Sequence, residues 1–378
     1  MGVIIVPAPP GALRVPCDQR AVQEAPMPRP SVRRGTALAL SALLLPVLAA
    51  CGGSDSEKNG KETEAGEQKG AEKLVIYSGR NEELISPIIG KLEKATGTDV
   101  EVRYGDSAEL AAQILEEGDR TKAGLFFSQD AGALGALSQA GQLAKLPQKS
   151  LDKVDAAFRG GEQDWVGVSG RSRVIAYNPK SAGKVPDSIH DLTAPKWKGK
   201  VGYAPTNASF QAFVTGMRVL EGEDATLKWL KGLKANGKTY AKNGAVLDAV
   251  DSGEVSLGLI NHYYWYEKVA ELGEDKVNAK IHFLPGGDSG ALINAAGVGV
   301  LKNGGQGAAA EKAVDYLLSK EAQTYFAEET KEYPLASGVT STVKGLPALD
   351  SLDAPKIDLG KLESLQQTLE LLKKAGMV

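Results

Sequence analysis

Residues 74–118 read LVIYSGRNEELISPIIGKLEKATGTDVEVRYGDSAELAAQILEEG and contain two strand–helix units in succession. The apolar stretch 74–77 and the alternating stretch 99–104 predict strands. Segments 82–95 and 107–117 space their apolar residues at helical intervals and predict amphipathic helices. Strand, turn and helix in this repeating order are typical of a parallel sheet covered by helices on both faces. The sequence therefore predicts an α/β fold from this point onward.

The same order of elements continues along the chain. Further strands are expected at 125–127, 165–169, 173–177, 200–203, 255–260 and 291–301. Further helices are expected at 131–140, 210–220, 225–233, 244–251, 265–272, 308–328 with a break near Ser319, and 359–375. With 378 residues the chain is long enough for two lobes, each with its own buried core.

The N-terminal part has the pattern of a secreted lipoprotein. Two arginines precede the apolar run 36–47, which is too short to span a bilayer and is followed by small residues and Cys51. We expect 1–50 to be a signal peptide, with Met27 as the candidate true start, and Cys51 to be the lipidated residue. Residues 51–73 would then be the lipidated cysteine and a polar, disordered tether. A buried cysteine after a hydrophobic helix is the alternative, and the export route stays open.

Composition excludes several classes of protein. A net charge of -3 with 42% hydrophobic and 24% charged residues argues against nucleic acid as a partner. The two cysteines are Cys17 and Cys51, so the sequence after Cys51 has no thiols for a disulfide or a cysteine metal cluster. The three histidines lack the spacing of a zinc site: His190, His262 and His282. The sequence has no GxSxG, Walker or CxxC motif, so we expect no enzymatic activity.

Four loops are placed where ligands bind in α/β proteins. In open α/β sheets, ligands lie at the carboxyl ends of strands, where helices begin and present free N–H groups. The loops of this kind are 78–81, 128–130, 205–209 and 261–264. Two come from each half of the chain, so a cleft lined by all four could close on a ligand.

The segment 261–266, NHYYWY, is the most informative of these loops. Adjacent side chains can converge where a strand passes into a helix, so Tyr263 and Tyr264 could present two phenolates to one point. Phenolates are negative, hard oxygen donors and suit a trivalent cation. Two alternatives are an aromatic cluster packed in a core or lobe interface, and a cation–π cage of Tyr263, Tyr264 and Trp265 around an organic amine.

Two further stretches suggest an anion site. In 169–173, SGRSR, either Arg171 or Arg173 could hold an anion with its planar fork, or form a surface salt bridge instead. In 207–209, NAS, backbone N–H groups at a helix start could cradle an anion, or the asparagine could act as an N-cap.

Several motifs in sequence together resemble the ferric-ion-binding proteins of bacterial iron ABC transporters. They are LVIYSGRNE (74–82), SGRSRV (169–174), KWKGKVGYAPT (196–206), LKWLKGL (227–233), YAKN (240–243), LINHYYW (259–265) and EYPL (332–335). The resemblance runs from Leu74 to about Ser341. It implies a two-lobed periplasmic-binding-protein fold of the type II, transferrin-like kind, with ferric iron bound in the interlobe cleft by two tyrosinates and an exogenous anion. Lobe 1 would comprise 74–170 plus 292–342, and lobe 2 would comprise 171–291 plus 343–378.

The resemblance also implies a ligand set. Tyr263 and Tyr264 match the family's tyrosine ligands. Phosphate-using members hold their anion at the positions of Asn207, Ala208, Ser209, Asn243 and Asn261, and carbonate-using members hold theirs at the position of Arg171.

Three positions depart from the patterns of individual members. Asn81 and Gln129 stand where some members have His and Glu, and neutral amides are poorer ferric ligands. Phe210 stands where other members have a third tyrosine. Asn81, Gln129 and Asp130, water or another tyrosine are therefore the candidates to complete the metal shell.

The function implied is that of an extracytoplasmic solute-binding lipoprotein. It would capture Fe³⁺ with carbonate or phosphate and deliver it to an ABC permease and its ATPase, as a monomer held on the outer face of the cell membrane by its lipid anchor. Two alternatives stay open. The first is the same fold with another solute, such as a phosphonate, thiamine or a polyamine; the second, less favoured, is a lipid-anchored enzyme.

Overall fold

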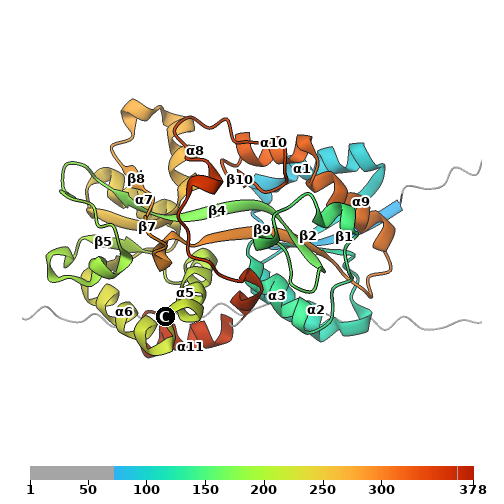
Figure 1. The fold of residues 1–378 in the computed structure, drawn as a ribbon, viewed down its shortest axis with the longest axis horizontal. Helices are drawn as coiled ribbons and strands as arrows, with labels where there is room; N and C mark the ends of the chain where they lie inside the picture. The colour runs from blue at the N-terminus through green and yellow to red at the C-terminus, as the bar shows by residue number, and fades with distance from the viewer. Residues whose placement is uncertain (1–71, 364) are drawn as a thin grey trace, which may run out of the picture. The chain divides into compact units, whose positions relative to one another are not determined.

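The computed structural model describes residues 72–363 and 365–378, in which strands and helices alternate (Figure 1). The strands are β1 (Glu72–Ser78), β2 (Thr98–Tyr104), β3 (Leu125–Ser128), β4 (Trp165–Tyr177), β5 (Val201–Tyr203), β6 (Gly237–Thr239), β7 (Leu257–Asn261), β8 (Lys280–His282), β9 (Ile293–Val300) and β10 (Tyr333–Pro334). The helices are α1 (Glu82–Thr96), α2 (Ser107–Glu117), α3 (Ala131–Gln139), α4 (Gln148–Leu151), α5 (Ala208–Glu221), α6 (Glu223–Asn236), α7 (Asn243–Ser252), α8 (His262–Leu272), α9 (Gly307–Leu317), α10 (Lys320–Glu328) and α11 (Leu365–Lys374). The predicted signal peptide, Cys51 and nearly all of the predicted tether lie outside the described residues.

The first three strand–helix units follow the prediction. β1 lies between β2 and β3 and is parallel to both. A short polar residue at the end of each strand or loop then caps the following helix by accepting a backbone N–H bond: Asn81 for α1, Asp106 for α2 and Asp130 for α3. Because β1 and β3 are parallel, the loops that follow them lie at the same edge of the sheet.

The parallel pairing predicted from the first strand–helix units does not extend through the whole sheet, which is mixed. The strand order is β2-β1-β3-β9-β4-β7-β5-β6, with β8 and β10 paired to β4. β9 runs antiparallel to both β3 and β4, and β4 runs antiparallel to β7. Helical crossovers enforce parallel pairing only between the strands that they join directly. β9 instead enters from the second half of the chain, so no crossover fixes its direction.

The two strands expected at 165–169 and 173–177 are one strand, β4. The polar residues Arg171 and Ser172 looked like a loop in the sequence, but they are buried and pair with Asn294 and Ile293 of β9. From Arg173 onward, β4 pairs with β7 and β8 instead. β4 therefore passes from the first half of the sheet into the second (Figure 1). Its polar residues Arg171, Ser172 and Arg173 are buried.

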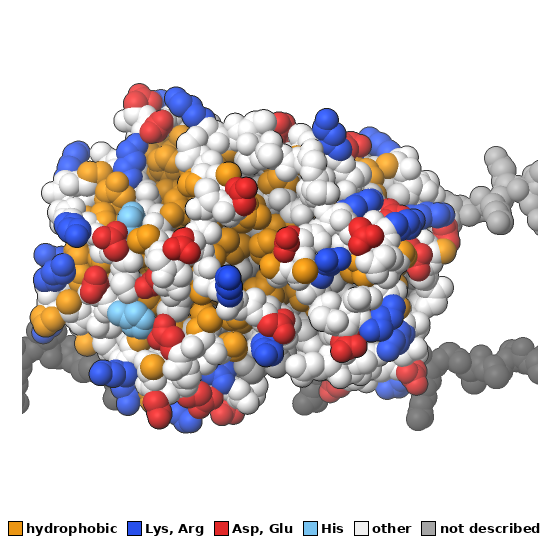
Figure 2. Space-filling view, viewed as in Figure 1, with side chains coloured by type: hydrophobic (Ala, Val, Ile, Leu, Met, Phe, Trp, Pro, Cys, Tyr) orange, Lys and Arg blue, Asp and Glu red, His pale blue; other side chains and the backbone are white. Residues whose placement is uncertain are grey.

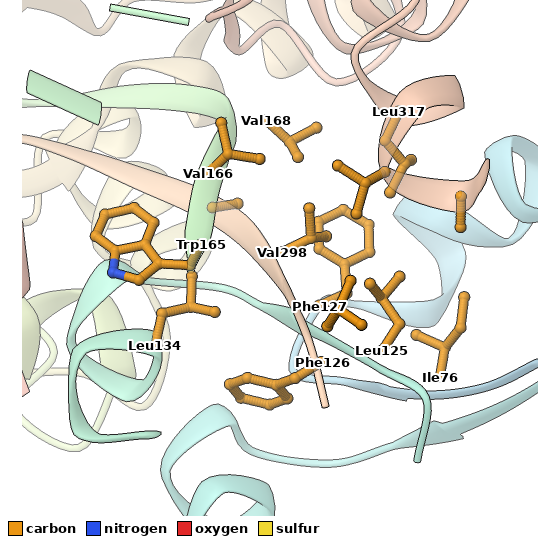
Figure 3. Packing of buried hydrophobic residues seen from close by; sticks show 14 of the residues in the cluster. Ile76, Leu125, Phe126, Phe127, Leu134, Trp165, Val166, Val168, Val298 and Leu317 are labelled. Atoms are coloured by element: carbon orange, nitrogen blue, oxygen red, sulfur yellow. The ribbon is translucent and has the colours of Figure 1, made fainter. Parts of the chain in front are cut away.

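The buried apolar residues of the described chain form separate clusters. One cluster packs around β1, β3 and β9 and includes Phe126, Phe127, Trp165 and Val298 (Figure 3). A second cluster lies between β5, β7 and the helices α5, α6 and α11, and a third lies between β7 and the helices α7 and α8. The predicted lobe boundaries at 170, 291 and 342 stay a prediction.

The long helix expected at 359–375 is interrupted. Leu359–Glu363 forms a 3₁₀ turn that packs on α3, and α11 packs on α5 and α6. The turn approaches α3 closely because α3 has glycines there: a methyl group at Gly132 would lie 2.4 Å from the carbonyl oxygen of Leu362. The C-terminal segment thus contacts elements of both halves of the sheet.

Charged side chains of both signs are spread over the face seen in Figure 2, in keeping with the small net charge. Within residues 72–363 and 365–378, no helix is both long enough and apolar enough to cross a membrane.

Candidate functional site

A polar cavity of about 990 Å³ opens where the loops after β1, β3, β5 and β7 meet. The four loops predicted to converge do so, and α10 and the residues after it add a further wall. The residues that line the cavity and matter below are Arg80, Asn81, Gln129, Asn207, Ala208, Ser209, Tyr263, Tyr264, Glu267 and Glu332.

Tyr263 and Tyr264 are stacked at the start of α8. Their ring centroids are 4.4 Å apart, and the ring planes differ by 27°. α8 begins at His262, directly after β7, rather than near Trp265 as the sequence predicted. Both tyrosines therefore lie in the first helical turn, at the carboxyl end of a buried strand. This is the position at which two adjacent side chains can reach one ligand.

The electrostatic surroundings keep Tyr263 protonated in the absence of a cation. Burial raises the pKa of Tyr263 well above 10, and the neighbouring Tyr264 and Glu332 raise it further, while Arg171 opposes the shift. Burial disfavours a phenolate because the charge loses its hydration. A cation that ionises this phenol must therefore interact strongly with the phenolate oxygen.

Glu332 holds two buried arginines in the cavity wall. Arg80 donates from Nη1 to Oε1 of Glu332 at 3.1 Å and from Nη2 to Oε2 at 2.7 Å. Arg171 donates from Nη2 to Oε1 at 3.0 Å. Burial would raise the pKa of Glu332, but Arg80 and Arg171 outweigh burial and lower that pKa to about 2. Glu332 is therefore a carboxylate at every ordinary pH.

Arg171, a predicted anion ligand, is engaged by the protein itself. Besides Glu332, its Nη1 donates to the backbone oxygen of Gln129. The side chain is 2% exposed. The guanidinium group of Arg171 is thus already hydrogen-bonded within the protein. Its role in binding carbonate stays a prediction.

Arg173 is a buried cation whose described partners are all neutral. It donates from Nη1 to Ser209 Oγ and to Asn261 Oδ1, both at 3.3 Å, and from Nη2 to the backbone oxygen of Leu259 at 3.1 Å. Burial lowers the pKa of Arg173 to about 10, while Tyr264 and Tyr263 oppose the shift. A guanidinium without a carboxylate in its described surroundings favours an anion nearby.

The predicted anion loop is assembled around Arg173. Asn207 caps α5 and accepts from Ser209 N at 3.0 Å and from Ser209 Oγ at 2.7 Å. Asn243 Nδ2 donates to Asn207 Oδ1 at 3.2 Å and to Ser209 Oγ at 2.8 Å. Asn261 Nδ2 is buried and, within the described part of the chain, has no acceptor. Through Arg173 these side chains form one connected hydrogen-bond network, and Ala208 is the first residue of α5.

Of the residues expected to complete the metal shell, two line the tyrosine cavity and one lines another cavity. Asn81 lines the cavity, and its Oδ1 accepts from Glu83 N at 2.8 Å. Gln129 also lines it, and its Oε1 accepts from Arg80 Nη1 at 2.9 Å. Asp130 instead lines a separate, more apolar cavity beside α2 and α5, where it caps α3. The structure therefore does not bring Asp130 to the tyrosine pair.

Two neighbours of the tyrosines are not available to a ligand. Trp265 packs in the third core cluster, and its Nε1 donates to the backbone oxygen of Ala279 at 2.7 Å. The cation–π cage that would have included Trp265 is therefore wrong. His262 is fully buried and uses both ring nitrogens, one with Ser172 N at 3.2 Å and one with Lys331 O at 3.0 Å.

Three residues of the site were missed by the sequence reasoning: Arg80, Glu267 and Glu332. Arg80 and Glu332 stand inside motifs that carried the resemblance, but nothing local shows that they pair. Glu267 follows Tyr263 by four residues, and this spacing places two side chains on one helix face. The described residues contain no group of three or more His, Cys, Asp or Glu that could hold a metal, so tyrosine oxygens are the distinguishing donors here.

Comparisons with known proteins identify the family of this chain. Residues 121–357 match the family described as bacterial extracellular solute-binding protein. The chain is 37% identical over 308 residues to the major ferric iron-binding protein of Neisseria meningitidis, with 80% of this chain and 93% of that protein covered. It is 34% identical over 308 residues to the Fe(3+)-binding periplasmic protein of Serratia marcescens, with 81% and 90% covered.

A solved structure shows the same fold. Iron-bound HitA from Pseudomonas aeruginosa matches with a TM-score of 0.76 at 35% identity, and the match covers 80% of this chain and 99% of that one. The predicted fold class, α/β with two lobes of the type II, transferrin-like kind, is confirmed by these likenesses.

Proposed function

This chain belongs to the family of bacterial extracellular solute-binding proteins, and from that premise we propose that it captures ferric iron in the cavity lined by Tyr263 and Tyr264. The stacked tyrosine pair at the start of α8 is the observation that carries the proposal. Two phenolates offer hard, negatively charged oxygens, which a trivalent ion binds more strongly than softer or less charged metals. The names of the relatives in Neisseria and Serratia support the same cargo.

The proposed binding step couples metal capture to proton loss. The phenol of Tyr263 is protonated in the empty cavity because of its raised pKa. Ferric ion replaces the phenol proton, and the phenolate charge then offsets part of the charge of the metal. No covalent change in the protein is needed.

A synergistic anion completes the proposal. Ser209 and Asn261 accept hydrogen bonds from the buried Arg173, and Asn207 and Asn243 are bonded to Ser209. Within the described chain, Nδ2 of Asn261 has no acceptor, and it is a donor that an anion would satisfy. The geometry supports phosphate or carbonate at this loop more than at Arg171, whose fork is held by Glu332.

Proteins of this family deliver their cargo to ABC transporters, and relatives are periplasmic by name. We infer that this chain acts outside the cytoplasm, anchored by a lipid on Cys51, and passes iron to a permease driven by its ATPase. The contacts of the C-terminal segment with both halves of the sheet support a protein whose halves move only within limits.

The proposal is tested by visible absorbance of the purified protein during titration with ferric citrate, in bicarbonate and separately in phosphate. A tyrosinate-to-iron band that saturates at one equivalent is expected, and Tyr263→Phe and Tyr264→Phe should each weaken it strongly. Tyr240→Phe is the matched control, because its hydroxyl bonds Glu254 outside the cavity and the band should stay unchanged.

The anion dependence tests the second part of the proposal. Loss of the phosphate enhancement in Ser209→Ala, with the band retained, would support the anion loop. A colourless protein in both buffers would contradict the ferric proposal and leave the Arg173 network as a site for an anionic solute such as a phosphonate.

A further inference from the structure

Glu267 is a carboxylate on the same helix face as the tyrosine pair. It follows Tyr263 by four residues and Tyr264 by three, and all three side chains line the same cavity. Side chains on an α-helix lean toward its N-terminus, so Glu267 leans toward the turn that carries the tyrosines.

Glu267 has no partner among residues 72–363 and 365–378: no hydrogen bond or ion pair of the described chain engages its carboxyl group. The other carboxylate close to the tyrosines, Glu332, is saturated by Arg80, Arg171, Ser169 and Thr330. Glu83, Asp106 and Glu329 also line the cavity, but they are exposed. Among the acidic residues described in this wall, Glu267 is the partly buried one whose oxygens stay open to a ligand.

Its surroundings favour a cation beside it. Burial, together with the negative charge of Glu332, raises the pKa of Glu267 to about 7, while Arg80 and Lys331 oppose the shift. A largely buried carboxylate without a partner is costly, and a metal cation at the tyrosines would remove that cost.

The chemistry of the site leaves room for such a ligand. Asn81 and Gln129 are neutral amides, and the oxygens of both already accept protein hydrogen bonds. Two phenolates leave a ferric ion with one positive charge before the exogenous anion is counted. A carboxylate is a hard oxygen donor that binds the same class of metal and would neutralise this charge.

We propose that Glu267 is a ligand of the captured metal ion and supplies, from α8, an anionic oxygen donor to a cavity in which Asn81 and Gln129 offer only neutral amides. This inference rests on the proposed ferric function. It assigns three anionic oxygen donors, those of Tyr263, Tyr264 and Glu267, to two turns of one helix.

The test compares Glu267→Gln with Glu329→Gln. Glu329 lines the same cavity and carries the same charge, but it is exposed, so its removal controls for the general loss of negative charge. Ferric affinity is measured by competition with citrate, and the position of the tyrosinate band is recorded at saturation. Thermal unfolding of the metal-free variants shows that both are folded.

Glu267→Gln is expected to lower the ferric affinity by about 10- to 100-fold relative to Glu329→Gln. The band should persist but move to longer wavelength, because a metal that has lost an anionic ligand accepts charge from phenolate more easily. Glu267→Asp should restore part of the affinity.

The outcomes separate this inference from the function on which it rests. A wild-type protein without the band contradicts the ferric proposal itself. A normal wild-type band together with equal affinity and band position in Glu267→Gln and Glu329→Gln would overturn the role of Glu267 alone. Metal-free Glu267→Gln should unfold no earlier than the wild type, since the substitution removes an unpartnered, largely buried carboxyl group.

Discussion

Arg80 and Glu332, 252 residues apart in the chain, form a two-point ion pair in the wall of the tyrosine cavity, with N–O distances of 3.1 and 2.7 Å. Arg171 approaches the same carboxylate at 3.0 Å. One buried carboxylate therefore fixes two guanidinium groups beside the site, and several expectations about stability follow from its charge.

Glu332→Gln should lower the free energy of unfolding by at least about 2 kcal/mol, because it leaves two buried guanidinium groups without a counter-charge. Urea unfolding of the metal-free protein measures the change. Glu329→Gln removes an exposed carboxylate nearby and should change stability by less than about 0.5 kcal/mol. Equal effects of the two substitutions would contradict the importance of the buried pair.

Lowering the pH should remove the contribution of Glu332 to the free energy of unfolding over a defined pH range. Its pKa in the folded protein is about 2, below its ordinary value of 4.5. A carboxyl group with a lowered pKa stabilises the fold above its unfolded pKa, and its contribution disappears as the pH falls through the folded pKa. The stability difference between wild type and Glu332→Gln should therefore shrink between pH 4.5 and 2. A difference that stays constant over this range would show that the carboxylate charge is not its source.

Ferric affinity should rise with pH, because the phenol of Tyr263, with its raised pKa, must lose a proton to bind the metal. Each phenol that ionises contributes about a tenfold change in affinity per pH unit while it is protonated in the free protein. Proton release on iron binding, followed with a weakly buffered indicator dye, should fall by about one proton in Tyr263→Phe. Unchanged proton release in this variant would show that the phenolate of Tyr263 does not form.

Gly132→Ala and Gly135→Ala should each destabilise the fold by about 1–3 kcal/mol, because the added methyl groups meet rigid backbone. They would lie 2.4 Å from the carbonyl oxygen of Leu362 and 2.5 Å from that of Gly360. Gly90→Ala is the matched control within helix α1, where a methyl group meets nothing within 4 Å. This control should stabilise the protein by up to about 1 kcal/mol in the same thermal or urea unfolding experiment.

The local sequence pattern was sufficient to predict helix bounds where the apolar spacing and the capping residues agreed. The helix expected at 107–117 is α2 with the same bounds, and the break expected near Ser319 separates α9 from α10. The convergence of four loops followed from a general property of α/β sheets. The tyrosine pair was found because two adjacent phenols at a strand–helix junction are distinctive even without tertiary information.

Tertiary contacts determined the features that the sequence pattern did not predict correctly. The start of α8 was placed too late because four aromatic residues in a row, 263–266, gave no helical spacing. Arg171 and Ser172 suggested a loop, although pairing with β9 keeps them inside the sheet. Gln129 and Asp130 are neighbours in sequence, yet they face different cavities, and no local signal tells which one reaches the tyrosines.

Because β4 is one continuous strand, the insertions and deletions that it can accept during evolution are restricted. Arg171 and Arg173 share one face of the strand, and Arg173 pairs with Asn261 of β7 while Arg171 pairs with Asn294 of β9. Gain or loss of a single codon between the two arginines would turn all the following side chains to the opposite face. The length of this segment is therefore constrained, because one strand carries both the side chain that bonds Glu332 and the side chain that bonds Ser209 and Asn261.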